Sequence, residues 1–406
     1  IAPASAAQAT PASTNRAVGL VCIAHFLSHF YLMLLPPLFP VLSQAMNIGY
    51  TEVGIALTGF SLVSGFTQAP MGFLVDRFGP RSILISGILI ESIAFGMIGI
   101  APVYGIFLAL LGIAGVANSV YHPADYVILN SIVQDSRIGR AFSYHTAAGL
   151  LGEAVAPAFI LLLAALVNWP TALLISGSIG ILTAIGLLMN TRSLTINSTE
   201  LGASSAGAKN GINILFSAPI LMGVVFFIGI SVVNRGITGF SVSALHESHG
   251  LSLGVAGTLL SAWLFASPIG VLLGGRIADR SKHHARNIAV CFTLIAACII
   301  GIVVFSPSIW ICGPLFALGG FFAGMVSPSR DMLIRSVTPA GQYGKVFGFV
   351  STGFNIGGIL APPVYGYILD NSNADLVFWI AALASVLTIF TVLGTKPIRR
   401  NGKLPH

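Results

Sequence analysis

The sequence predicts an all-α membrane protein whose twelve transmembrane helices form two six-helix bundles. Of the 406 residues, 55% are hydrophobic and only 8% are charged, against about 25% charged residues in an ordinary soluble domain. Because so few charges could not cover the surface of a soluble chain, the composition excludes a soluble enzyme, a disulfide scaffold, a disordered protein and a coiled coil. The four cysteines lie in apolar runs and are expected to be small core residues.

Twelve apolar runs are each long enough to cross a bilayer, which requires roughly 20 residues. They lie at 17–42, 52–74, 82–101, 104–132, 141–167, 170–189, 217–244, 254–275, 287–306, 309–336, 345–369 and 375–394. The longest polar stretch separates the first six runs from the last six. We therefore expect a flexible tail at 1–15, an N-terminal bundle at 16–189, a central linker at 190–213, a C-terminal bundle at 214–395 and a second tail at 396–406.

The positions of the basic residues predict how the chain is oriented. Of 19 Lys and Arg residues, sixteen lie in the tails or at alternate connections, and none lies in the remaining connections. By the positive-inside rule, both termini and the central linker are cytoplasmic. The net charge of +7 is thereby explained without a nucleic-acid partner. We expect an integral protein of a bacterial inner membrane that is monomeric, is surrounded by lipid and needs no cofactor.

The two halves of the chain repeat each other weakly. Gly72 aligns with Gly275 at an offset of 203 residues, and Pro123 aligns with Pro328 at an offset of 205. Parallel repeats related by an axis along the membrane normal are a transporter architecture, in which the substrate binds near the midplane between the halves. The repeat therefore indicates a transporter rather than an enzyme.

One short loop carries a recognisable motif. Between the second and third runs the sequence reads Gly72-Phe-Leu-Val-Asp76-Arg77-Phe-Gly79-Pro-Arg81, and the second half has the partial copy Gly275-Arg-Ile-Ala-Asp279-Arg280. The motif resembles the G-x-L-x-D-R-x-G-x-R loop of the major facilitator superfamily. That resemblance implies transport by alternating access, with a gating role for Gly72, Asp76, Arg77, Gly79, Arg81, Asp279 and Arg280.

Within that superfamily the chain is most similar to the fosmidomycin-resistance-type exporters, which implies efflux. The similar segments are His25-Phe-Leu-Ser-His29-Phe-Tyr31, Ser119-Val-Tyr-His122-Pro123 and Gly149-Leu-Leu-Gly152-Glu153-Ala-Val-Ala-Pro157. Three positions depart from the pattern: His29 replaces an acidic residue, Ala156 replaces a glycine, and Leu108 stands where many proton-coupled members have an arginine. These departures bear on proton coupling and on the direction of transport.

Ionisable residues inside the runs are candidate functional sites, because charges are costly there and usually face a wet cavity or a partner. They are Glu91, Asp125, Glu153, Arg235, Arg330, Asp331 and Arg335. The planar guanidinium group suits a carboxylate or phosphonate, so we predict an anion site at Arg235 and Arg330. Further predicted solute contacts are His29, His122, Tyr31, Asn118 and Asn234. The alternative for Arg330 is a structural ion pair with Asp331 or Asp125.

Carboxyl groups inside the runs are predicted to carry a coupling proton. Burial favours the protonated form of a carboxyl group, which makes Asp125, Glu153 and Asp331 the candidates. The alternative for Glu153 is a structural hydrogen bond to a neighbouring helix. No ATP-binding loop is found, so an ion or substrate gradient must drive transport.

The sequence predicts a secondary transporter of a small, anionic organic solute, coupled to protons, and leaves three alternatives open. The first is an exporter of lipophilic drugs. The second is a transition-metal transporter, because His25, His29 and Met33 recur at helical spacing on one face, with His122 and His145 in nearby runs. The third is a membrane sensor that does not transport. His246-Glu247-Ser-His249 is one residue short of a zinc-protease motif and does not indicate an enzyme.

Overall fold

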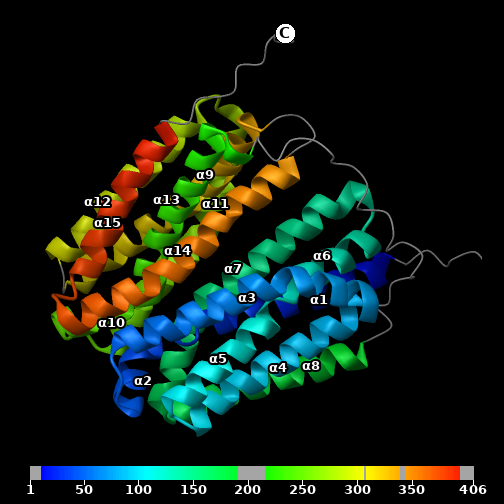
Figure 1. Cartoon of the computed structure of the whole chain (residues 1–406), viewed down its shortest axis with the longest axis horizontal. Helices are drawn as coiled ribbons and strands as arrows, with labels where there is room; N and C mark the ends of the chain where they lie inside the picture. The colour runs from blue at the N-terminus through cyan, green and yellow to red at the C-terminus, as the bar shows by residue number, and fades with distance from the viewer. Residues whose placement is uncertain (1–10, 191–214, 306–307, 339–342, 394–406) are drawn as a thin grey trace, which may run out of the picture. The chain divides into compact units, whose positions relative to one another are not determined.

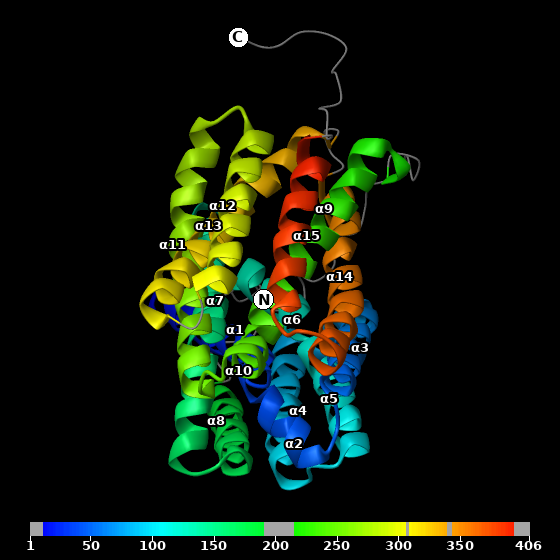
Figure 2. The same ribbon diagram turned by 90° about the vertical axis from the view of Figure 1, so that its left-hand side faces the viewer.

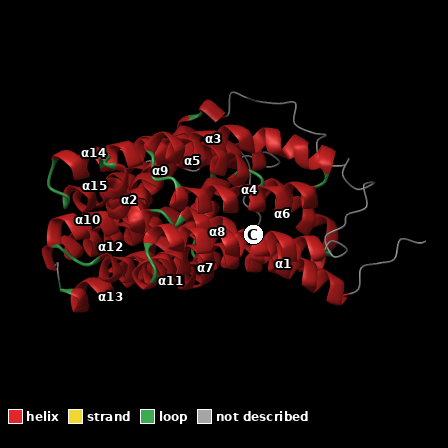
Figure 3. Ribbon diagram, turned by 90° about the horizontal axis from the view of Figure 1, so that it is seen from below, coloured by secondary structure: helices red, strands yellow, loops and turns green. Residues whose placement is uncertain are grey.

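The computed structural model describes residues 11–190, 215–305, 308–338 and 343–393. All regular structure in these ranges is helical (Figure 3). Eleven helical segments within the described residues are long and apolar enough to cross a membrane. The predicted span at 52–74 lies within helix α3 (Tyr50–Phe78), which is not among the eleven because Ser, Thr, Gly and Gln interrupt its apolar stretch. The predicted linker and both predicted tails fall mainly outside the described residues.

The chain forms two compact units. The first comprises Ile1–Leu32, Leu62–Ala156 and Leu163–Ala206, and the second comprises Met33–Ser61, Pro157–Leu162 and Gly207–His406. This division follows the predicted halves except at 33–61 and 157–162, which pack with the second unit. The homology of the two halves stays a prediction.

The first unit is built from helices that lie side by side in Figure 1. They are α1 (Pro11–Leu32), α4 (Pro80–Ile100), α5 (Tyr104–Asn118), α6 (Tyr121–Ile132), α8 (Trp169–Met189) and most of both α3 and α7 (Asp135–Leu166). Helix α4 packs against α5, α6 and α8, and α1 packs against α6.

The predicted span at 104–132 is interrupted, as its proline suggests. Helix α5 ends at Asn118 and α6 begins at Tyr121. Pro123 has no N–H with which to bond the carbonyl of Ser119 four residues earlier, so the helix cannot continue regularly at that point. The interruption separates Asn118 from the histidine and aspartate on α6.

Close backbone contact brings α1 and α7 together. A side chain at Gly152 would place its Cβ only 2.2 Å from the carbonyl oxygen of Phe26. One turn earlier, a Cβ at Gly149 would lie 2.9 Å from ring atoms of both His25 and His29. Glycine at these two positions therefore allows the imidazole groups of α1 to fit against α7.

The second unit contains the remaining helices. They are η1 (Pro36–Leu38), α2 (Phe39–Met46), the start of α3, α9 (Ala218–Asn234), a π-helical turn η4 (Arg235–Phe240), α10 (Ser241–His249), α11 (Leu253–Arg280), α12 (His284–Phe305), α13 (Ile309–Ser336), α14 (Tyr343–Asn371) and α15 (Leu376–Leu393). Figure 2 shows α11, α12 and α13 grouped together, and α9, α14 and α15 grouped beside them.

The start of α3 is held in the second unit by the end of α14. The backbone N–H groups of Tyr50 and Thr51 each donate to the carboxylate of Asp370 over 2.7 Å. A Cβ at Gly54 would lie 2.3 Å from the carbonyl oxygen of Pro362, so the two helices touch through their backbones. Asp370 thus caps the N-terminus of α3, where amide groups have no partner within the helix.

We predict that Asp370→Ala destabilises the protein by about 1 kcal/mol, the typical contribution of an N-terminal cap. The substitution removes the acceptor of two helix-initiating N–H groups, whereas Asp370→Asn retains an amide oxygen and has a smaller effect. The measurement is thermal unfolding in detergent. Asn371→Ala is the control, because its side chain is exposed and bonds to the carbonyl of Tyr367 on its own helix. Equal melting temperatures for Asp370→Ala and the unmodified protein would contradict this account.

Candidate solute and proton site

Four histidines and two carboxylates meet within the first unit. Three helices supply them: His25 and His29 from α1, His122 and Asp125 from α6, and His145 and Glu153 from α7. Residues three or four positions apart share one face of a helix, which explains the pairs on α1 and on α6. On α7 the two residues are two turns apart, and Gly149 lies between them on the same face.

The inner part of this cluster is fully buried. Asp125 is 0% exposed, and its Oδ2 lies 2.9 Å from Nε2 of His145 and 3.4 Å from Nδ1 of His25. The two imidazole rings stack with a centroid separation of 3.5 Å. A buried carboxylate is stable only with such partners, so these two imidazoles determine the environment of Asp125.

The outer part of the cluster is partly exposed. Nδ1 of His29 lies 2.7 Å from Oε1 of Glu153, and their side chains are 22% and 24% exposed. The ring centre of His25 lies 4.6 Å from that of His29 and 5.3 Å from that of His122. These contacts connect a partly exposed carboxylate to a fully buried one through two imidazole groups.

A separate buried cluster surrounds Glu91 on α4. Its carboxylate accepts hydrogen bonds from the hydroxyl of Tyr121 over 2.6 Å and from the amide of Asn118 over 3.2 Å. The hydroxyl of Tyr31 bonds to Ser92 and to the carbonyl oxygen of Ser176, each over 3.0 Å. Tyr31 and Asn118 thus bond to protein groups, and their predicted contact with solute stays a prediction.

The predicted arginines lie in the second unit. Nε of Arg330 donates to Oδ1 of Asp331 over 2.8 Å, which is one of the two structural pairs the sequence left open. The guanidinium carbon of Arg330 lies 5.3 Å from the ring centre of Phe227 and 5.6 Å from that of Phe354, within cation–π range. Because Asp125 belongs to the first unit, its predicted relation to Arg330 stays a prediction.

Arg235 begins the π-helical turn that follows α9. Such turns are uncommon and occur frequently at functional sites. The guanidinium group of Arg235 lies against α14, where a Cβ at Gly358 would be 3.3 Å from its Nη2. Asn234, the other predicted contact on this segment, precedes the turn and is exposed. The role of both residues in binding solute stays a prediction.

The predicted gating loop has the backbone geometry that its glycine suggests. Gly79 is the N-cap of α4 and has a φ of 85°. Residues other than glycine rarely adopt this backbone conformation. Asp76 and Arg77 are exposed at the end of α3, and Arg77 lies over the ring of Phe78.

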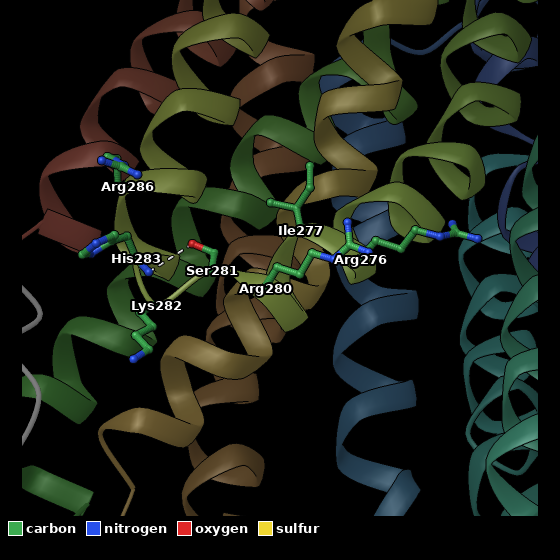
Figure 4. A pocket seen from close by; sticks show the side chains of 7 residues that line it. All are labelled: Arg276, Ile277, Arg280, Ser281, Lys282, His283 and Arg286. Atoms are coloured by element: carbon green, nitrogen blue, oxygen red, sulfur yellow. Dashed lines mark hydrogen bonds between the residues drawn. The ribbon is translucent and has the colours of Figure 1, made fainter. Parts of the chain in front are cut away.

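The partial copy of the loop borders a basic pocket at the end of α11. The pocket has a volume of about 560 Å³ and is lined by Arg276, Ile277, Arg280, Ser281, Lys282, His283 and Arg286. Figure 4 shows Lys282 and Arg286 pointing in opposite directions. The cationic groups therefore do not converge on one point. The gating role of both loops stays a prediction.

The metal-binding face predicted on the first span comprises residues of both units. Helix α1 ends at Leu32, and Met33 lies beyond it in a segment that packs with the second unit. The role of His25, His29 and Met33 as a metal-binding face stays a prediction. The structure places His25 beside Asp125 and His145, a combination that no sequence spacing indicated because the three residues lie on different helices.

Comparison with known proteins places the chain in a family. The family model described as the Major Facilitator Superfamily matches residues 21–311 and 224–405. The chain belongs to this superfamily. The predicted fold class and the expectation of a transporter rather than an enzyme are thereby confirmed. The transporter shares 22% identity over 400 residues with the fosmidomycin resistance protein of Escherichia coli strain K12, covering 96% of this chain and 95% of that protein.

Two further relatives are described as transporters of organic anions. A probable sulfoacetate transporter, SauU, of Cupriavidus necator is 23% identical over 419 residues, covering 96% of this chain and 97% of that protein. A D-galactonate transporter of Escherichia coli O6:H1 is 24% identical over 398 residues, covering 89% of this chain and 90% of that protein.

Solved structures show the same fold. The transporter matches the nucleoside transporter NupG (D323A mutant) with a TM-score of 0.78 and 14% identity, covering 93% of this chain and 99% of that chain. It matches an inward-facing, occupied bacterial homologue of the human lysosomal transporter Spinster with a TM-score of 0.71 and 14% identity, covering 95% of each chain. At this identity the likeness concerns the fold.

Proposed function

We propose that this transporter moves a small organic anion by alternating access and that a proton drives the movement. Two of its relatives are described as transporters of sulfoacetate and D-galactonate, which are anions. Arg235 supports the same class of substrate, because a guanidinium group inside a membrane-spanning segment is costly unless it serves a partner or a ligand. Its place at the π-helical turn is the observation that best supports an anion site.

The pair formed by His29 and Glu153 supports proton coupling. Both side chains are partly exposed and lie 2.7 Å apart, a distance at which a carboxylate and an imidazole can share a proton. Glu153 is therefore the residue that we propose to exchange the proton. Asp125 and Asp331, the other carboxylates proposed from the sequence, are respectively fully buried and paired with Arg330.

Export of a drug-like compound is the second candidate function. It is supported by the relative described as a fosmidomycin resistance protein and by a relative described as a multidrug resistance efflux pump, PmrA homologue, of Lactococcus lactis. Exporters and importers share the same fold, so the direction of transport is established by measuring flux and not from the architecture.

We expect Arg235→Ala to raise the KM for an anionic solute by about 10–150-fold, because a hydrogen bond to a charged group contributes about 1.5–3 kcal/mol. Arg235→Lys keeps the charge but lacks the planar guanidinium group. Its KM should lie between those of the unmodified protein and Arg235→Ala. The assay is uptake of labelled sulfoacetate or galactonate into proteoliposomes. Arg286→Ala, an exposed arginine at the basic pocket, is the control. If Arg235→Ala leaves the KM for both anions unchanged and the protein transports a lipophilic drug, the drug-exporter function is favoured.

We expect Glu153→Gln to abolish accumulation driven by an imposed pH gradient while leaving exchange of labelled for unlabelled solute intact. Glutamine resembles the protonated carboxyl group but cannot release a proton. Asp375→Asn is the matched control, since Asp375 forms a comparable pair with His249 over 3.0 Å in the second unit. Unchanged accumulation in Glu153→Gln would refute this assignment.

We also propose that the protein lies in a bacterial inner membrane with both termini in the cytoplasm. The support is the distribution of Lys and Arg along the sequence and the bacterial origin of the relatives. Protease should remove tags from both termini in inside-out vesicles and from neither in intact spheroplasts. Cleavage of either tag in intact spheroplasts would contradict the proposed orientation.

A further inference from the structure

We infer that His25, Asp125 and His145 form a binding site for one divalent first-row transition-metal ion. Each residue offers one ligand atom, and these three atoms all lie within 4.8 Å of one another. Two imidazole nitrogens and a carboxylate oxygen are ligands that suit Zn²⁺, Co²⁺, Ni²⁺ and Cu²⁺. This inference concerns metal binding and does not depend on the proposed transport function.

Two buried polar atoms at this place are available to bind a ligand. His25, Asp125 and His145 are 3%, 0% and 2% exposed. Nδ1 of His25 and Oδ1 of Asp125 have no hydrogen-bond partner among the described residues. Buried polar atoms in native proteins are nearly always paired. A cation bound between these side chains would satisfy both atoms at once.

The arrangement differs from an ordinary pair of aspartate and histidine. Such a pair needs one imidazole, and His145 already provides it over 2.9 Å. The second imidazole, that of His25, approaches the same oxygen at 3.4 Å without forming a hydrogen bond. In the second unit, His249 and Asp375 form the ordinary arrangement, with a single partly exposed imidazole. That pair provides a comparison within the same chain.

Further donors surround the three proposed ligands. His29 and His122 lie beside His25, with ring centres 4.6 and 5.3 Å away. The ring centre of Tyr126 lies 5.8 Å from that of His145. A tetrahedral metal ion needs a fourth ligand, and these imidazoles or a water molecule are the groups at hand.

A bound ion would join three helices. His25 lies on α1, Asp125 on α6 and His145 on α7, so coordination cross-links the first unit at a point where those helices have no covalent connection. A ligand that binds the folded state and not the unfolded state stabilises the protein by mass action. Metal binding should therefore raise the melting temperature as well as produce a stoichiometric complex.

The test uses the full-length protein, purified in detergent with a tag that contains no histidine and treated with a chelator. Zn²⁺ and Co²⁺ are added in equilibrium dialysis, bound metal is measured by elemental analysis, and Co²⁺ is also followed by its visible absorption. We expect one ion per chain, visible bands typical of a tetrahedral site, and a higher melting temperature with metal than without.

Three substitutions and one control decide where the ion binds. His25→Gln, Asp125→Asn and His145→Gln keep polar side chains of similar size and should each weaken binding at least 100-fold. They should also remove the metal-dependent rise in melting temperature, which distinguishes lost coordination from lost folding. His249→Gln should bind as the unmodified protein does. Stoichiometric binding that persists in all three variants, binding that is lost only in His249→Gln, or no binding at 100 μM metal would each overturn the inference.

Discussion

The contact between α1 and α7 at Gly152 determines where the charged groups of the first unit can lie. With no side chain at this position, the helix backbones approach until a Cβ would be only 2.2 Å from the carbonyl oxygen of Phe26. The approach leaves room for the rings of His25 and His29 against Gly149. It also brings α7 close enough for His145 to reach Asp125 on α6. A larger residue at Gly152 would force the backbones of α1 and α7 apart.

Because lipid offers no hydrogen bonds, each charged group within the spans must be stabilised inside the protein, and the structure does so in three ways. Asp125 pairs with the imidazole of His145 and lies beside that of His25. Glu91 accepts from a phenol and an amide. Arg330 pairs with its neighbour Asp331 and lies over two phenylalanine rings. Only the first arrangement leaves buried polar atoms unpaired, which sets it apart as a site for a ligand rather than a structural pair.

Interruptions of the helices place the remaining functional candidates. Pro123 separates α5 from α6, so that Asn118 and Tyr121 both turn to Glu91. The prolines at 36 and 37 form the turn η1 between α1 and α2, in a segment that belongs to the second unit. The π-helical turn at Arg235 widens the backbone where the guanidinium group meets α14. Irregular backbone in a membrane protein is tolerated only where it is enclosed by protein or lines a cavity, so these positions are natural places for function.

The sequence by itself determined that the protein is an all-helical membrane transporter of the major facilitator superfamily. Apolar runs of bilayer length and the Gly72–Arg81 motif are linear patterns, which can be read without knowing which helices touch. It also identified Asp125, Glu153, Arg235 and Arg330 as unusual, because a charge within an apolar run is visible in one dimension. The partners of these charges were decided only by tertiary structure. His145 reaches Asp125, and Asp370 caps the start of α3. Each of these depends on how helices distant in sequence rotate and approach one another, and the spacing of residues within one helix contains no information about that packing.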